Sequence, residues 1–322
     1  MSQTMKISQK SKIKNKKFGK YFLRFTISIF MGLICLIPSL LFSADITLIA
    51  SLAGDKQMGK FNQPISLFFD ESKKRLYIAD TGNNRLISFD SEFNYISEFD
   101  VGGKLKYPMS LVRNSQEQFF VIGGPAKNEI FFIDIPQRDF RRLEIRDSPV
   151  GENSVIPGKL AIDKNDNLYI TDRGNGRILV LNSKGRFLRE IKVENRFADF
   201  SDMRVDMDGN VYSLSTMEGK VYIFNNKGEL TLSFGKKGEG LQEFEFPVSI
   251  AVDKNGLIYV LDQHKGSILV FKKDGIFQSS FLKNGWNPGE LNKPSYLYTD
   301  MENKIYIVDR GNNRIQVFQA GK

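Results

Sequence analysis

Three stretches share one pattern: Asp80-Thr-Gly-Asn-Asn-Arg85-Leu, Asp172-Arg-Gly-Asn-Gly-Arg177-Ile and Asp309-Arg-Gly-Asn-Asn-Arg314-Ile. A short run with a central Tyr precedes each stretch, and a second run rich in apolar residues follows it. Short runs rich in Ile, Val, Tyr and Phe that flank Gly and Asn are typical of strands joined by a tight turn. Each stretch therefore predicts a β-hairpin, with an Asp on one side of its turn and an Arg on the other.

Weaker copies of this pattern occupy residues 120–132, 211–224 and 258–271. The turns of all copies lie roughly 45 residues apart, a period typical of propellers and other repeat arrays. A Pro precedes the first run in five copies: Pro64, Pro108, Pro157, Pro247 and Pro294. Each copy holds four strand-like runs and no helical stretch. The sequence therefore predicts an all-β fold, a six-bladed β-propeller of four-stranded blades.

The last copy lacks its fourth run, because the sequence given stops at Lys322 after the third. Residues 46–53, Ile-Thr-Leu-Ile-Ala-Ser-Leu-Ala, have the pattern of that missing run. We therefore expect this N-terminal strand to complete the last blade. Closing the ring in this way leaves only short, protected sheet edges.

The turn pattern, the Leu-Tyr-Ile before it and the Pro-led first strand closely resemble NHL repeats over residues 45–322. The resemblance is strong in copies one, three and six and weaker in the others, where Gly124 and Ser215 replace two of the Asp residues and Ser267 replaces an Arg. It implies a six-bladed propeller. We interpret the Asp–Arg pair as a structural ion pair, because an active site needs one constellation and this pair recurs in several blades.

A basic segment and an apolar segment precede the repeats. Residues 1–24 contain no acid and supply most of the net charge of +9, through Lys6, Lys10, Lys12, Lys14, Lys16, Lys17, Lys20 and Arg24. Residues 25–44 carry no charge, and a helix of about 20 such residues spans the hydrocarbon layer of a membrane. This order predicts a helical signal anchor with its basic end in the cytoplasm, or alternatively a cleaved signal peptide. Either way, the propeller at 45–322 is expected outside the cytoplasm: membrane-anchored in the first case, secreted or periplasmic in the second.

Catalytic residues are scarce in this sequence. One Cys and one His exclude a disulfide framework and a Cys/His zinc site. Some propellers of the family that the chain resembles are lyases, which hold a metal with several His ligands. Related six-bladed lactonases bind calcium through several carboxylates that point into the channel. Only Asp202 is a carboxylate among the positions expected to face the central channel. We therefore predict no catalytic residue, no metal and no cofactor, and keep a channel-site hydrolase or lyase as the alternative.

Alternate residues of each first strand are expected to face the channel. The second residues after the Pro position are Ser66, Ser110, Lys159, Asp202, Ser249 and Tyr296, and the fourth are Phe68, Val112, Ala161, Arg204, Ala251 and Tyr298. Lys159, Asp202 and Arg204 come from neighbouring blades, so polar groups converge there. A hydrated channel with one ion pair is the favoured interpretation, and a small-molecule site is the alternative.

The loops expected at the channel mouth carry further candidates. Trp286 is the only Trp of the chain, and Trp is enriched at interface hot spots. The predicted binding residues are Lys159, Asp202, Arg204, Tyr296, Arg173, Arg310, His264 and Trp286. The predicted function is non-catalytic binding or scaffolding of a protein, peptide or glycan partner. Nucleic acid is disfavoured because export argues against it and the chain beyond residue 24 is near neutral. No oligomeric state follows from the sequence.

Overall fold

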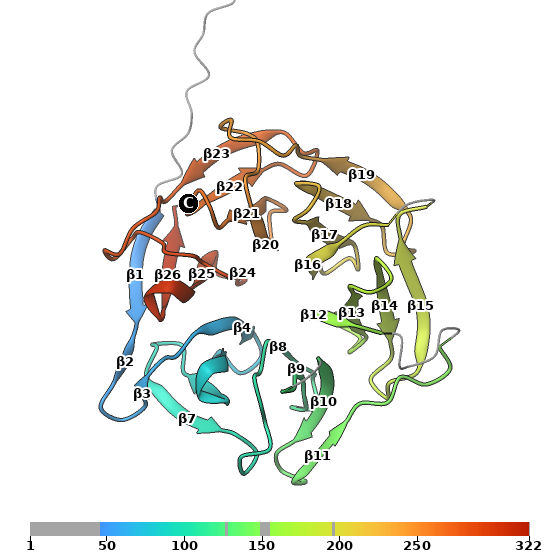
Figure 1. Cartoon of the computed structure of the whole chain (residues 1–322), viewed down its shortest axis with the longest axis vertical. Coiled ribbons are helices and arrows are strands. Elements are labelled where there is room, and N and C mark those ends of the chain that lie inside the picture. The colour runs from blue at the N-terminus through green and yellow to red at the C-terminus, as the bar shows by residue number, and fades with distance from the viewer. Residues whose placement is uncertain (1–45, 126–127, 149–154, 195–196, 322) are drawn as a thin grey trace, which may run out of the picture. The chain divides into compact units, whose positions relative to one another are not determined.

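A computed structural model describes residues 46–125, 128–148, 155–194 and 197–321 of the protein. Within these residues the chain forms six four-stranded antiparallel sheets around a common axis (Figure 1). Each sheet is one blade, and the first strand of each blade lies nearest the axis. The prediction of an all-β, six-bladed propeller is confirmed.

The strands follow one another in chain order within every blade except the last. Blade 1 contains β4 (Pro64–Asp70), β5 (Arg75–Asp80), β6 (Arg85–Phe89) and β7 (Tyr95–Phe99). Blade 2 contains β8 (Ser110–Arg113), β9 (Phe119–Gly123), β10 (Glu129–Asp134) and β11 (Asp139–Arg142). Blade 3 contains β12 (Pro157–Ile162), β13 (Leu168–Asp172), β14 (Arg177–Leu181) and β15 (Phe187–Lys192).

The second half of the chain builds the other blades in the same way. Blade 4 contains β16 (Phe200–Val205), β17 (Val211–Ser215), β18 (Lys220–Phe224) and β19 (Leu230–Phe234). Blade 5 contains β20 (Pro247–Val252), β21 (Ile258–Asp262), β22 (Ser267–Phe271) and β23 (Phe277–Phe281). Blade 6 contains β24 (Tyr296–Thr299), β25 (Lys304–Asp309), β26 (Arg314–Ala320) and, from the other end of the chain, β1 (Ile46–Leu52). A small hairpin, β2 (Gly54–Asp55) with β3 (Gly59–Lys60), follows β1.

Strand β1 closes the ring. It pairs antiparallel with β26, with Ile46 opposite Ala320 and Leu52 opposite Ile315. Its residues alternate between half-buried and exposed, as a strand with one face on a core requires. The half-buried side chains pack against two clusters, one shared by blades 5 and 6 and the other by blades 6 and 1. The expected completion of the last blade by the N-terminal strand is confirmed.

The hydrophobic core lies between neighbouring blades. In each first strand, the third residue after the Pro position is at most 1% exposed: Leu67, Leu111, Leu160, Met203, Ile250 and Leu297. Full burial of one such side chain stabilises the fold by about 1.5–3 kcal/mol. Because the same position is apolar in all six copies, every blade contributes one such anchor to the core.

The Asp–Arg turns also match the prediction. Nε of Arg85, Arg177 and Arg314 lies 2.7, 2.9 and 2.7 Å from the carboxylate of the Asp across its turn. The other oxygen of each Asp accepts a backbone N–H from the linker that enters the same blade, as Asn292 does at 2.7 Å from Asp309. Each buried carboxylate therefore ties a turn to a linker, which is a structural role.

Blade 4 has the same link between turn and linker, but here the carboxylate belongs to the linker and the turn supplies the donors. Ser215 stands where the other turns have Asp, and its hydroxyl donates to the carboxylate of Asp199 in the entering linker. Asp199 also accepts the backbone N–H of Met217 at 3.0 Å. The copy that looked degenerate in sequence therefore retains the link between turn and linker.

This exchange predicts unequal stability losses. We expect Asp309→Ala to lower the free energy of unfolding by about 3–5 kcal/mol, because it leaves the buried guanidinium of Arg314 without its counter-ion. Asp199→Ala removes hydrogen bonds but strands no buried cation, so a loss of about 1–3 kcal/mol is expected. Urea unfolding of both variants measures the difference. Equal losses would contradict the ion-pair role assigned to Asp309.

The predicted basic segment 1–24 and apolar helix 25–44 lie outside the described residues. Where the structure does describe the chain, no helix is long and apolar enough to cross a membrane. The anchor and its alternative, a cleaved signal peptide, therefore stay predictions.

Candidate functional site

Side chains from three blades meet at the axis of the propeller. β12 and β24 approach the axis from opposite sides (Figure 1). The ammonium of Lys159 on β12 lies 4.8 Å from the ring centroid of Tyr296 on β24, and the guanidinium carbon of Arg204 on β16 lies 4.5 Å from the same ring. Such distances are those of cation–π contacts. At this depth, then, blades 3 and 4 both reach blade 6 across the axis.

Asp202 is fully buried and accepts from several donors. One carboxylate oxygen accepts the Ser249 hydroxyl at 2.6 Å and the Ile250 backbone N–H at 3.0 Å. The other oxygen lies 3.3 Å from Nη1 of Arg204. The single ion pair predicted in the channel is therefore present, and Asp202 also fastens blade 4 to blade 5.

Serines at the equivalent positions fasten other blades. The Ser110 hydroxyl accepts the Leu160 backbone N–H at 3.0 Å, which joins blade 2 to blade 3. The Ser249 hydroxyl accepts the Leu297 backbone N–H at 3.0 Å, which joins blade 5 to blade 6. Both serines are at most 1% exposed. Sequence reasoning placed them at the channel wall. Their hydroxyls instead form hydrogen bonds between blades, because the backbone of the first strand of the next blade lies within hydrogen-bonding distance.

Lys159 occupies this position in blade 3 and makes no such link, since an ammonium has no lone pair to accept an N–H. Within the described part of the chain its ammonium has no hydrogen-bond partner and no ion pair. Burial lowers the pKa of Lys159; the charge of Asp202 opposes this shift, and the nearby Arg204 and Arg173 add to it. Burial also raises the pKa of Tyr296 to about 12, so this ring stays a neutral phenol.

Arg204 is held more completely. It donates to the backbone carbonyls of Met203 and Leu297, and the second of these bonds crosses to blade 6. Its guanidinium carbon also lies 6.0 Å from the ring centroid of Tyr298, whose hydroxyl donates to the Phe69 carbonyl at 3.2 Å. Arg204 therefore serves mainly as a structural link across the axis.

The residue after the turn Asp, or after Ser215 in blade 4, lies near the channel mouth, and in three blades its side chain donates to the carbonyl of the next Pro. These donors are Thr81 to Pro108 at 2.6 Å, Thr216 to Pro247 at 2.6 Å and Gln263 to Pro294 at 2.9 Å. In blade 3 the residue is Arg173, which is exposed. No hydrogen bond or ion pair engages its guanidinium among the described residues.

Gly158 allows Arg173 to lie beside Lys159. A Cβ added at Gly158 would come within 2.7 Å of Cδ of Arg173, so the aliphatic stem of Arg173 rests on the glycine. A larger residue here would displace the stem. Blade 3 thus presents two cations at the mouth, and no carboxylate of the described residues forms an ion pair with either.

The other predicted mouth residues lie apart from this group. Arg310 donates to Gln63 at 3.0 Å and helps to line a hollow of about 400 Å³, together with Gln263, Lys293, Gly311 and Asn313. His264 is exposed and stacks on Phe246, with ring centroids 4.8 Å apart. Trp286 is 76% exposed. Within the described residues no hydrogen bond or ring contact joins His264 or Trp286 to the axial group.

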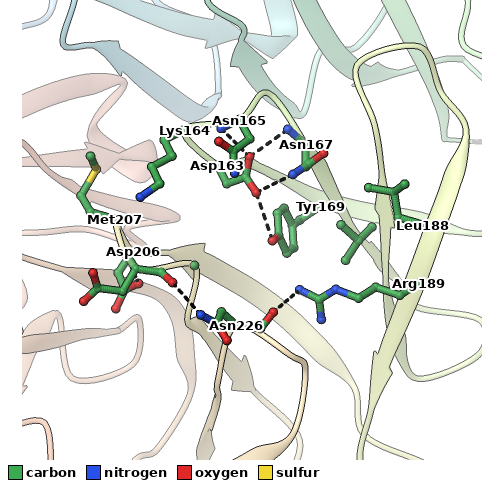
Figure 2. Close-up of a pocket in the computed structure, with 13 residues that line it drawn as sticks. Asp163, Lys164, Asn165, Asn167, Tyr169, Leu188, Arg189, Asp206, Met207 and Asn226 are labelled. Atoms are coloured by element: carbon green, nitrogen blue, oxygen red, sulfur yellow. Dashed lines mark hydrogen bonds between the residues drawn. The ribbon is translucent and has the colours of Figure 1, made fainter.

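A second hollow, of about 440 Å³, lies between blades 3 and 4 at the opposite face (Figure 2). Sequence reasoning missed it, although the Asp that opens the turn between first and second strands in every blade except blade 2 was a signal. Figure 2 shows the carboxylate of Asp163 holding its own turn and accepting from Tyr169 at 3.3 Å. Asp206 is used in the same way by the neighbouring turn. These carboxylates therefore stabilise turns.

Across the described ranges, no group of three or more His, Cys, Asp and Glu side chains is placed to share a metal ion.

Two family models match parts of the chain. One, described as a 6-bladed beta-propeller, matches residues 194–264 and 254–322. The other, the NHL repeat, matches residues 156–181, which include the Asp172–Arg177 turn.

Solved structures with the same fold come from proteins of different activities. An auxiliary nutrient binding protein from Bacteroides thetaiotaomicron has a TM-score of 0.66 and 13% identity, covering 86% of this chain and 76% of that chain. Virginiamycin B lyase from Staphylococcus aureus has a TM-score of 0.63 and 12% identity, covering 86% of this chain and 100% of that one. A gluconolactonase from Xanthomonas campestris has a TM-score of 0.63 and 13% identity, covering 87% and 91%.

At these identities the likeness establishes the fold, and the activities of the three proteins remain their own. The repeated Asp–Arg turns, the six blades and the matching family models agree with one another. The chain therefore contains an NHL repeat at residues 156–181 and folds as a six-bladed β-propeller.

Proposed function

We propose that this chain is a non-catalytic binding propeller that recognises a protein, peptide or glycan partner through the face around its channel mouth. One observation carries the proposal. At the position where three blades turn a side chain inward onto a backbone carbonyl, blade 3 exposes Arg173 without a partner among the described residues. Exposed Arg and Trp side chains are the types enriched at binding hot spots, and Trp286 lies in a linker on the same face.

The proposal places the propeller outside the cytoplasm. The basic segment 1–24 followed by the uncharged segment 25–44 supports export, with the segment retained as an anchor or cleaved as a signal. Fold neighbours described as auxiliary nutrient binding proteins from two Bacteroides species are consistent with a binding role.

A channel-site hydrolase or lyase is the alternative, since a lyase and a gluconolactonase share the fold. The axial geometry favours binding instead. Asp202, the one carboxylate among the axial positions, already accepts from Ser249, Ile250 and Arg204. A base or nucleophile needs a free oxygen that faces the substrate, whereas both oxygens of this carboxylate accept hydrogen bonds from the protein itself.

Partner capture by full-length protein tests the proposal. Tagged protein would be used in pull-downs from detergent-solubilised membranes and on a glycan array, beside the variant Arg173→Ala/Trp286→Ala. We expect the double variant to retain about one tenth or less of the captured partner, because both removed groups are exposed anchors. Lys254→Ala is the matched control, since Lys254 is an exposed cation on the opposite face. Equal capture by all three proteins would remove this face from the binding site.

A further inference from the structure

Blade 3 combines three neighbouring residues that no other blade has together. Gly158, Lys159 and Arg173 stand where blade 5 has Val248, Ser249 and Gln263. Blade 6 also has an arginine at the last of these positions, but Arg310 donates to Gln63. Gly158 carries the stem of Arg173, and the positive charge of Arg173 lowers the pKa of Lys159. The three residues therefore form one unit on the inner edge of the blade.

The charges of this unit are not balanced within the described residues. Asp202 is the nearby carboxylate, but its contacts are with Arg204, Ser249 and Ile250. The Lys159 ammonium lies over the ring of Tyr296. Among the described residues, no hydrogen bond or ion pair engages this ammonium or the guanidinium of Arg173. Cations gathered in a partly desolvated site are costly unless an opposite charge lies beside them.

We propose that the channel mouth binds the oxyanion of a small acidic ligand, a carboxylate or a phosphate, between Lys159 and Arg173 and above the ring of Tyr296. This rests on the proposed binding function and names the chemistry that its site takes. The planar guanidinium of Arg173 supplies a fork of N–H donors that matches either oxyanion, and Lys159 supplies a compact charge. The neutral Tyr296 ring provides an apolar wall for the rest of the ligand.

Binding of such a ligand depends on pH. The groups that face Lys159 are Asp202 and Arg204 from β16, Arg173 from the turn after β13 and Tyr296 from β24. Because these surroundings lower the pKa of Lys159, its charge is lost at a lower pH than that of an exposed lysine. Affinity for the anion should fall as pH rises through that pKa, and a bound anion should raise the pKa in turn.

Calorimetric titration of the full-length protein tests the inference with three probes that share one sugar ring: D-galacturonate, D-galactose 6-phosphate and D-galactose. We expect at least one acid to bind about tenfold more tightly than galactose, the effect of one charge-assisted hydrogen bond. Lys159→Met keeps the apolar stem and should reduce the acid to the galactose level. Gly158→Ala, which displaces Arg173, should weaken acid binding as well. Lys254→Met on the opposite face should change nothing.

The outcomes separate the ligand sources. Preference for galacturonate identifies a carboxylate, preference for the phosphate ester identifies a phosphate, and tight binding of both identifies a general oxyanion site. The inference is overturned if neither acid binds more tightly than galactose, or if Lys159→Met binds the acid as well as the unsubstituted protein does. Melting curves of the variants verify that they are folded. If the protein binds the acid but its capture of a partner does not depend on Trp286, only the proposed macromolecular partner is refuted. If it captures a partner but binds neither acid, only the oxyanion site is refuted.

Discussion

A chain that lacks residues 1–53 is expected to melt far below one that lacks only residues 1–45. The shorter deletion leaves β1 intact, whereas the longer one removes the fourth strand of blade 6. β1 pairs with β26 from Ile46 to Leu52, with an irregularity at Ile49, and its half-buried side chains cover the clusters on both sides of that blade. Losing this ladder and the apolar contacts of Ile46, Leu48, Ala50 and Leu52 should cost on the order of 5 kcal/mol.

The same deletion should also change how the protein associates. Without β1, strand β26 becomes an exposed edge that carries Val317 and Phe318, and such edges pair with other chains. Calorimetry together with size-exclusion chromatography of the two truncated proteins measures both effects. Matching melting temperatures and elution volumes would show that the ring does not need this strand.

Asp202→Ala is expected to cause the largest loss of stability from a single axial substitution, about 3–5 kcal/mol. It leaves the guanidinium of Arg204 without its counter-ion at a site where the guanidinium packs against the ring of Tyr296. It also leaves the Ile250 backbone N–H and the Ser249 hydroxyl without their acceptor. Urea unfolding measures the loss, with Asp208→Ala as the control because Asp208 is an exposed carboxylate.

A second variant separates the ion pair from the hydrogen bonds. Asp202→Ala/Arg204→Met removes both charges, so it should unfold at a higher urea concentration than Asp202→Ala alone. If the double variant is the less stable of the two, the buried charge of Arg204 is not what makes Asp202 important. If Asp202→Ala unfolds like Asp208→Ala, the carboxylate is not a link between blades at all.

The candidate site could be predicted only in part. Lys159, Asp202, Arg204 and Tyr296 were expected at the axis because side chains alternate along a strand, and the structure places them in contact there. That Arg173 lies beside Lys159 could not be foreseen, because the contact depends on how Gly158 faces the turn that follows β13. The roles of Ser110 and Ser249 were likewise hidden, since their partners belong to the next blade.

The fold itself was almost wholly contained in the order of residues. The residues that favour a turn act over a few positions, and the alternation of apolar and polar residues acts along one strand. The number of blades follows from the number of repeats. The blades and their closure by β1 could therefore be predicted from the sequence. Only the tertiary structure decided which polar groups form hydrogen bonds between blades and which do not. That depends on the distance between first strands of neighbouring blades, and on which donors meet an acceptor there. Asp202 accepts from three donors, whereas the Lys159 ammonium lies over the Tyr296 ring and has no hydrogen-bond acceptor among the described residues.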